Sequence, residues 1–279
     1  MITVAAIQEA FSEDIESNCA LIQGHVAEAA NSGAQIVLPP ELFQGHYFCK
    51  TETAEPFSTA YATEKHPVVI AMQEAAKAHG IAIPTSFFEK DGPHYYNSLA
   101  MIDGDGTILG VYRKSHIPDG PGYEEKFYFR PGNTGFRVWE TGYGTIGVGI
   151  CWDQWFPECA RAMTLAGADI LFYPTAIGSE PEEPDFDTAA PWRRAMQGHA
   201  VCNVAPVVAA NRIGNEAGQI FYGTSFICDQ FGDIITEADR TKSTLLKATF
   251  DLDQIREDRS TMGFFRDRRP ELYTDLTQT

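Results

Sequence analysis

Glu41, Lys114 and Cys151 are three reactive side chains, far apart along the chain, that could act together on a carbonyl group. Each comes just beyond a short apolar run of the kind that forms a buried strand. At the carboxyl edge of an open α/β sheet, such side chains project into the crevice where ligands bind. There a thiol can attack a carbonyl carbon, a carboxylate can accept the proton of the thiol, and an ammonium can stabilise the oxyanion.

The segment around Cys151 predicts a strand, a turn and a helix. Residues 145–150 are rich in glycine and β-branched residues, Pro157 opens a helical pattern that Gly167 ends, and residues 169–174 form the next apolar run. Cys151 therefore precedes a helix, whose N-terminal N–H groups favour the thiolate over the thiol.

Each candidate also has an ordinary structural explanation. A free cysteine is most often a small buried apolar residue. Glu41 could be a solvated loop carboxylate and Lys114 a surface charge. The local patterns alone leave both interpretations open.

Longer motifs around these residues resemble the nitrilase superfamily of carbon–nitrogen hydrolases, and the resemblance covers nearly the whole chain. In order and context, Glu41, Lys114 and Cys151 match the Glu–Lys–Cys triad of that superfamily. The matching segments are residues 38–41, 112–118, 125–129 with Pro131 and Gly132, and 149–153 with 156–158. Within the superfamily the sequence is most similar to the N-carbamoylputrescine amidohydrolases, through residues 120–129, 151–155 and 192–199.

The resemblance implies a role for each residue. Cys151 would be the nucleophile, Glu41 the general base and acid, and Lys114 an oxyanion partner together with the backbone N–H of Trp152. Glu125 matches a second glutamate that orients the substrate or the lysine, although it could also belong to an ordinary charged turn.

The residues after Cys151 bear on the tail of the substrate. Relatives that act on carbamoyl amino acids use arginines there to hold a carboxylate, whereas this chain has Gln154 and Trp155. The loop at residues 178–187 carries five acids and no base. We expect Glu180 to meet an ammonium tail, with Tyr47 or Trp152 along the alkyl chain.

The expected function is therefore a thiol amidohydrolase of polyamine biosynthesis that converts N-carbamoylputrescine to putrescine, carbon dioxide and ammonia. Within the superfamily, ω-amidase, nitrilase and carbamoyl-β-alanine hydrolase activities are the alternatives. Outside it, the fold could be a binding module without turnover. A thiol redox role is disfavoured because the chain has no CxxC pair.

Composition limits the possible partners. A formal net charge of −17 argues against nucleic acid and anionic membranes, because both need clustered basic residues. A negative field attracts cationic small molecules, although solubility is by itself the more common reason for such a charge. The N-terminus lacks a basic region and reads as a strand, not a signal peptide. Six scattered cysteines suit a reducing cytoplasm.

No cofactor is expected. His46 and Cys49 have the spacing of two metal ligands, but a structural zinc site needs four and no second pair follows.

The elements that must position these residues alternate between strand and helix in both halves of the chain. Helices are expected near residues 15–32, 66–80, 157–166 and 189–203, and hairpins at 97–112 and 223–236. This order predicts an α/β fold with two mixed sheets and outer helices, in agreement with the αββα four-layer sandwich of the superfamily. We expect one domain over residues 1–279. Its C-terminal arm, at about 260–279, either packs on its own subunit or reaches a partner in a homodimer or larger homo-oligomer.

Overall fold

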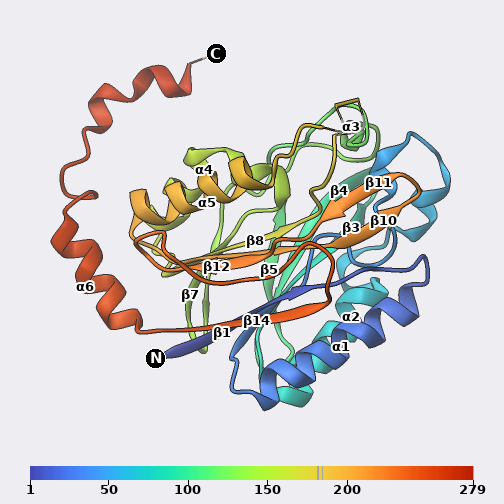
Figure 1. Ribbon diagram of the computed structural model, residues 1–279, viewed down its shortest axis with the longest axis horizontal. Coiled ribbons are helices and arrows are strands. Elements are labelled where there is room, and N and C mark those ends of the chain that lie inside the picture. The colour runs from blue at the N-terminus through green and yellow to red at the C-terminus, as the bar shows by residue number, and fades with distance from the viewer. Residues whose placement is uncertain (181, 184, 279) are drawn as a thin grey trace.

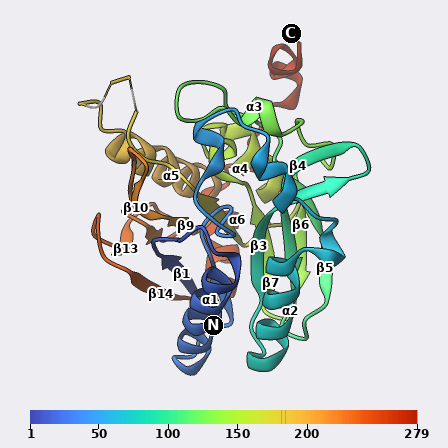
Figure 2. The same cartoon turned by 90° about the vertical axis from the view of Figure 1, so that its right-hand side faces the viewer.

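The computed structural model describes residues 1–180, 182–183 and 185–278. Two β-sheets pack face to face and helices cover both outer surfaces. Figure 1 shows α1 and α2 on one side of the strands and α4 and α5 on the other. In Figure 2, which is turned by 90°, the hairpin of β3 and β4 projects from the body.

The first sheet is formed mainly by the N-terminal half. Its strands form two ladders, β14-β1-β2 and β3-β4-β5, which a parallel bridge between Ile36 and Ala82 joins. Parallel and antiparallel pairs both occur in it. The strands are β1 (Ile2–Gln8), β2 (Ile36–Leu38), β3 (Ile83–Asp91), β4 (His94–Ile102), β5 (Ile108–Arg113) and β14 (Thr244–Phe250).

The second sheet comes from the C-terminal half and is also mixed. Its strands have the order β13-β12-β9-β8-β7-β6, with β7, β8 and β9 parallel. They are β6 (Val138–Thr141), β7 (Gly144–Val148), β8 (Ile170–Thr175), β9 (Val207–Asn211), β12 (Phe226–Cys228) and β13 (Ile234–Glu237). A separate hairpin contains β10 (Ile213–Glu216) and β11 (Gln219–Tyr222).

Alternation along the strands places the helices outside. In β1, Val4 and Ala6 belong to the core between the sheets, whereas Ala5 and Ile7 belong to the core under α1 (Ile15–Asn31) and α2 (Pro67–His79). On the second sheet, the outer core lies under α4 (Pro157–Leu165) and α5 (Ala189–Asn203). The predicted four-layer αββα sandwich is confirmed.

Capping side chains, a proline and a glycine mark the helix ends. The Asp14 side chain accepts a hydrogen bond from the N–H of Ser17 at the start of α1, and Asp251 caps α6 (Leu252–Met262) in the same way. Pro67 opens α2, and Gly80 ends it with a φ of 62°. No helix in the described residues has the length and apolar character needed to cross a bilayer.

Candidate active site

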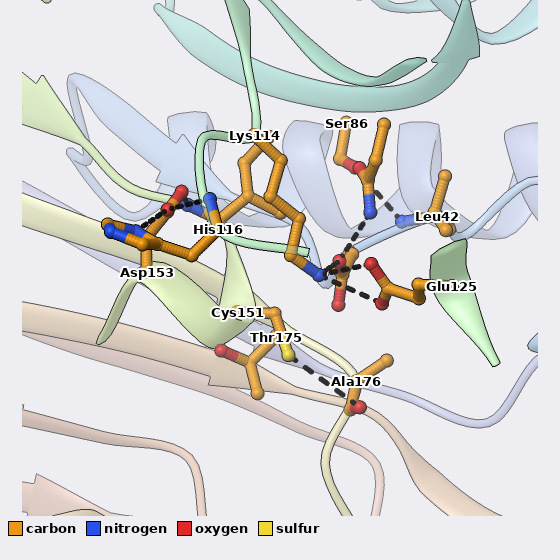
Figure 3. Close-up of polar contacts among 12 residues, drawn as sticks. Leu42, Ser86, Lys114, His116, Glu125, Cys151, Asp153, Thr175 and Ala176 are labelled. Atoms are coloured by element: carbon orange, nitrogen blue, oxygen red, sulfur yellow. Dashed lines mark hydrogen bonds and ion pairs between the residues drawn. The ribbon is translucent and has the colours of Figure 1, made fainter. Parts of the chain in front are cut away.

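The ends of three strands bring the candidate residues together. Glu41 follows β2, Lys114 follows β5, and Cys151 opens a short 3-10 helix, Cys151–Trp155, after β7. The Nζ of Lys114 lies 3.0 Å from Oε1 of Glu41 and 2.8 and 2.7 Å from the two carboxylate oxygens of Glu125. Glu41, Lys114 and Glu125 are fully buried. Figure 3 shows this ammonium between the strand ends, with the sulfur of Cys151 beneath it.

The surroundings of Cys151 disfavour a negative charge on its sulfur. Burial, followed by the negative charge of Glu41, raises the pKa of Cys151 well above its usual value, and the Lys114 ammonium only partly opposes this. Burial and the charge of Glu41 therefore oppose the thiolate that the helix N-terminus was expected to favour. Two carboxylates beside one ammonium already leave the site with an excess of negative charge, so a thiolate would add to it.

The carboxylate of Glu41 has one occupied and one free oxygen. Its Oε1 accepts hydrogen bonds from Lys114 Nζ and from Nδ2 of Asn97, at 3.0 and 2.7 Å. Its Oε2 is buried and has no hydrogen-bond partner among the described residues. A buried acceptor without a partner is costly, so Oε2 is the oxygen available to the proton of a neighbouring thiol.

Asp153 fixes the turn that carries the thiol. Cys151 has a φ of 42°, in the left-handed region that a residue with a side chain adopts only when its surroundings hold it there. The buried carboxylate of Asp153 accepts hydrogen bonds from the N–H groups of Ile150 and His116, both at 3.0 Å, and from the hydroxyl of Tyr112 at 2.8 Å. These bonds tie the turn after β7 to the segment that bears Lys114.

The backbone N–H of Trp152 lies in the first turn of the same 3-10 helix. Donors at that position have no acceptor within the helix, so they remain available to an anion. An oxyanion formed on a carbonyl carbon attached to sulfur would therefore find a backbone donor here and an ammonium in Lys114.

Glu125 is held at the far side of Lys114. Burial raises the pKa of Glu125 to about 7, the charge of Glu41 adds to this rise, and Lys114 opposes it. The hydroxyl of Tyr47 donates to Oε1 of Glu125 at 2.7 Å. Tyr47, expected along the alkyl chain of the substrate, is fully buried and is absent from the described residues that line the cavity over Cys151.

A cavity of about 170 Å³ opens over the thiol. Its lining is mostly apolar, and its only charged side chains are the carboxylates of Asp119 and Glu180 among the described residues. The lining residues are Pro118, Asp119, Gly120, Pro121, Tyr123, Cys151, Trp152, Trp155, Ile177 and Glu180. A second cavity of about 280 Å³ shares Pro121 and Glu180 and adds Glu182, Glu183 and Phe186.

The acidic loop and the segment after Cys151 both contribute residues to the cavity. Pro181 and Pro184 of the loop lie outside the described residues. Burial, followed by the charge of Glu183, raises the pKa of Glu180. Trp155 lines the cavity, but Gln154 points away from it, since its Oε1 accepts from Trp192 Nε1 at 2.7 Å.

Comparisons with known proteins agree with this arrangement. The family model described as "Carbon-nitrogen hydrolase" matches residues 3–260. The chain belongs to the carbon–nitrogen hydrolase family. It is therefore a hydrolase acting on carbon–nitrogen bonds, and the predicted resemblance to the nitrilase superfamily is confirmed.

Two relatives and one solved structure describe this part of the family. An N-carbamoylputrescine amidase of Arabidopsis thaliana is 55% identical, over 99% of this chain and 95% of the relative. A citrullinase of Francisella tularensis is 51% identical, over 99% and 98%. The solved structure of the E41Q mutant of an amidase from Nesterenkonia sp. AN1 is 27% identical, with a TM-score of 0.82 over 98% and 96% of the two chains. It shows covalent addition of the acetamide moiety of fluoroacetamide at the active site cysteine of that protein.

Sequence reasoning missed two residues of this site. Asn97 lies in the apolar run of β4, and a polar residue at a buried strand position is the only signal for it. Asp153 stands two residues after the nucleophile, inside a recognised motif, but its role as an acceptor for donors from two separate segments depends on the fold.

Proposed function

We propose that this protein is a thiol amidohydrolase that cleaves N-carbamoylputrescine to putrescine, carbon dioxide and ammonia. The observation that supports this most is the cavity, in which a buried thiol lies opposite carboxylates, and the described lining residues include no lysine, arginine or histidine. Such a cavity suits a neutral carbamoyl group followed by a cationic tail. The N-carbamoylputrescine amidase of Arabidopsis thaliana, 55% identical, supports the same substrate.

In the first step, the sulfur of Cys151 bonds to the carbamoyl carbon as Oε2 of Glu41 accepts the proton of the thiol. The carbonyl oxygen gains the negative charge, which Lys114 Nζ and the N–H of Trp152 stabilise. Collapse of this intermediate breaks one carbon–nitrogen bond, and Glu41 returns its proton to the departing nitrogen.

In the second step, Glu41 accepts a proton from water, and the resulting hydroxide adds to the thiol-bound carbonyl. The carbon–sulfur bond then breaks, and the proton returns to Cys151. The released carbamic acid loses carbon dioxide and leaves an amine. The sum is the same whether ammonia or putrescine departs first.

Glu180 and Asp119 are the groups that we assign to the ammonium of the tail, and Trp152 to the alkyl chain. Trp152 is 39% exposed at the cavity, as expected of a residue that a substrate covers. Tyr47 is reassigned to Glu125, whose position fixes the Lys114 ammonium.

Citrulline is the rival substrate, because a citrullinase is 51% identical to this chain. Citrulline carries the same carbamoyl group, but its tail bears a carboxylate beside the ammonium. Its carboxylate would enter a cavity whose charged lining residues are themselves carboxylates, so like charges would oppose binding.

The test is ammonia release by the purified protein from N-carbamoylputrescine, citrulline, carbamoyl-β-alanine and an ω-amide. We expect the highest kcat/KM for N-carbamoylputrescine and no release by the Cys151→Ala variant. The matched control is Cys202→Ala, which removes an exposed thiol and should keep full activity. Turnover by Cys151→Ala would exclude the thiol mechanism. A higher kcat/KM for citrulline would make citrulline the substrate in place of N-carbamoylputrescine.

We also propose a cytoplasmic, single-domain protein that forms a homodimer or a larger homo-oligomer. All six cysteines lie in the described part of the chain and are free thiols, which suits a reducing compartment. The C-terminal arm supports the assembly, as argued below.

A further inference from the structure

A buried ion pair lies beside the site and has no role in the proposed chemistry. Arg212 follows β9 and Glu216 ends β10, and their side chains are 0% and 3% exposed. Nη1 of Arg212 donates to Oε1 of Glu216 at 2.8 Å. A buried pair is costly unless further hydrogen bonds satisfy both groups, so the remaining partners of each group show what the pair holds.

Arg212 holds the backbone of the general base. Its Nη2 donates to the carbonyl oxygens of Glu41 and Leu42, at 2.8 and 2.9 Å. Leu42 has a φ of 47°, a left-handed conformation that a leucine keeps only under constraint. Its N–H donates to Oγ of Ser86 at 3.1 Å, so hydrogen bonds hold both the N–H and the carbonyl group of Leu42. Glu41 precedes this bend directly, so the backbone that carries its side chain is held by the same hydrogen bonds.

Glu216 is connected to the carboxylate of Glu125 through Tyr47. Its Oε2 accepts a hydrogen bond from the N–H of Tyr47 at 2.5 Å. The hydroxyl of Tyr47 in turn donates to Oε1 of Glu125. One buried ion pair is therefore connected to Glu41 through one partner and to Glu125 through the other.

The guanidinium itself is immobilised by aromatic rings. Its Cζ lies 5.1 Å from the ring centroid of Phe11 and 5.4 Å from that of Phe221. A lysine at this position could keep the charge beside Glu216, but a single ammonium lacks the planar fork that reaches two carbonyls and a carboxylate at once.

We propose that Arg212 and Glu216 are positioning residues that align Glu41 and Glu125 around Lys114. This inference rests on the proposed function, because it assigns the pair to the base of that reaction. Small displacements of a catalytic group cost much of its effect, so loss of the pair lowers the chemical step more than substrate binding.

The test compares Arg212→Lys and Glu216→Gln with Arg256→Lys. A glutamine at 216 has one acceptor oxygen and cannot serve both Arg212 and the Tyr47 N–H. Arg256, on α6, pairs with Asp169, away from the candidate residues, and provides the same arginine-to-lysine substitution in another ion pair. We expect kcat to fall about 10- to 100-fold in the first two variants with KM changed less than about threefold, and no change in Arg256→Lys.

A second readout is the rate at which acrylamide alkylates Cys151, measured in a Cys202→Ala background with and without Glu41→Gln. With Glu41 present, Arg212→Lys and Glu216→Gln should slow alkylation at neutral pH about tenfold or more. With Glu41→Gln they should add no further effect, because the group that they align is gone. Equal slowing in both backgrounds, no slowing in either, or unfolding of both variants would overturn the proposal.

This readout does not depend on the substrate. Wild-type protein that is alkylated normally but releases no ammonia from N-carbamoylputrescine would contradict the proposed function and leave the positioning role to be decided by alkylation.

Discussion

At the residue scale, burial favours the protonated form of Cys151, and one oxygen of Glu41 is available to accept that proton. Lys114 and Asn97 occupy Oε1 of Glu41 and leave Oε2 free. Burial and the charge of Glu41 keep the pKa of Cys151 high. Attack therefore begins from a neutral thiol and needs the base during the step, which explains why the orientation of Glu41 matters.

Glu125 should give the acid limb of the pH profile. Because its pKa is raised to about 7, the group is protonated below that pH and ionised above it. Protonation removes one of the two negative charges that hold Lys114, so kcat should fall as the pH drops through about 7. Glu125→Gln should lower kcat about 100-fold and remove this limb. The measurement is kcat against pH, with Glu124→Gln as the neighbouring control; an unchanged limb in Glu125→Gln would assign the titration elsewhere.

Glu180 should act on binding and not on chemistry. Its pKa is raised by burial and by Glu183, so it loses its charge at a higher pH than an exposed glutamate does as the solution is acidified. Glu180→Gln should raise KM for N-carbamoylputrescine about tenfold or more with little change in kcat, because one charged partner of the tail is lost. Steady-state kinetics beside Glu140→Gln, an exposed carboxylate on β6, measure this. An equal KM in both variants would remove Glu180 from the site.

At the element scale, strand ends and one 3-10 turn determine where the chemistry occurs. The sequence allowed Glu41, Lys114 and Cys151 to be chosen because each follows an apolar run, and the motifs around them added Glu125. Asn97 could not be chosen in this way. Its relation to Glu41 depends on how β4 pairs with its neighbours, which no local pattern records.

Other elements could not be recognised in the sequence because their composition gives no clear secondary-structure pattern. Strand β3 continues from Ile83 to Asp91, through charged residues beyond its buried part, and turns at Gly92 into β4. The hairpin of β10 and β11 has only four residues in each strand, with Glu216 and Gln219 at the turn, so its apolar residues form no long run. Residues 42–65 contain short 3-10 helices, which are too short to give a periodic pattern.

Asp153→Asn should impair both stability and turnover. The asparagine has one acceptor oxygen for donors from Ile150, His116 and Tyr112, so at least one buried donor loses its partner, at a cost of about 1–3 kcal/mol in the free energy of unfolding. The turn at Cys151 should relax and kcat should fall.

The matched control is Asp169→Asn. Asp169 accepts hydrogen bonds from the N–H of Thr145 and from Arg256. It lies where β7 and β8 begin, at the end of these strands away from Cys151. Urea unfolding should show a loss of stability in both variants, whereas kcat at a temperature where both are folded should fall only in Asp153→Asn. Equal kcat values would make Asp153 a purely structural residue.

At the scale of the whole molecule, both halves contribute to one site. The first sheet supplies Glu41 and Lys114 and the second supplies Cys151, so the packing of the two sheets is what brings base and nucleophile together. The aligning pair also crosses this division, because Arg212 follows a strand of the second sheet and binds the backbone beyond β2. Catalysis should therefore be lost as soon as the interface between the sheets loosens.

The C-terminal arm should determine the oligomeric state. Figure 1 shows the last segment running away from the body, and Leu272 and Leu276 on it are 64% and 70% exposed. Large apolar side chains so exposed usually become buried against a partner, and a second copy of the chain is the partner that we expect. The double variant Leu272→Ser/Leu276→Ser should form a smaller oligomer than the wild type. Its molar mass in solution, measured by light scattering after gel filtration, should be lower by a whole number of subunit masses. Leu21→Ser, an exposed leucine on α1, should leave it unchanged; an unchanged mass in the arm variant would return the arm to packing on its own subunit.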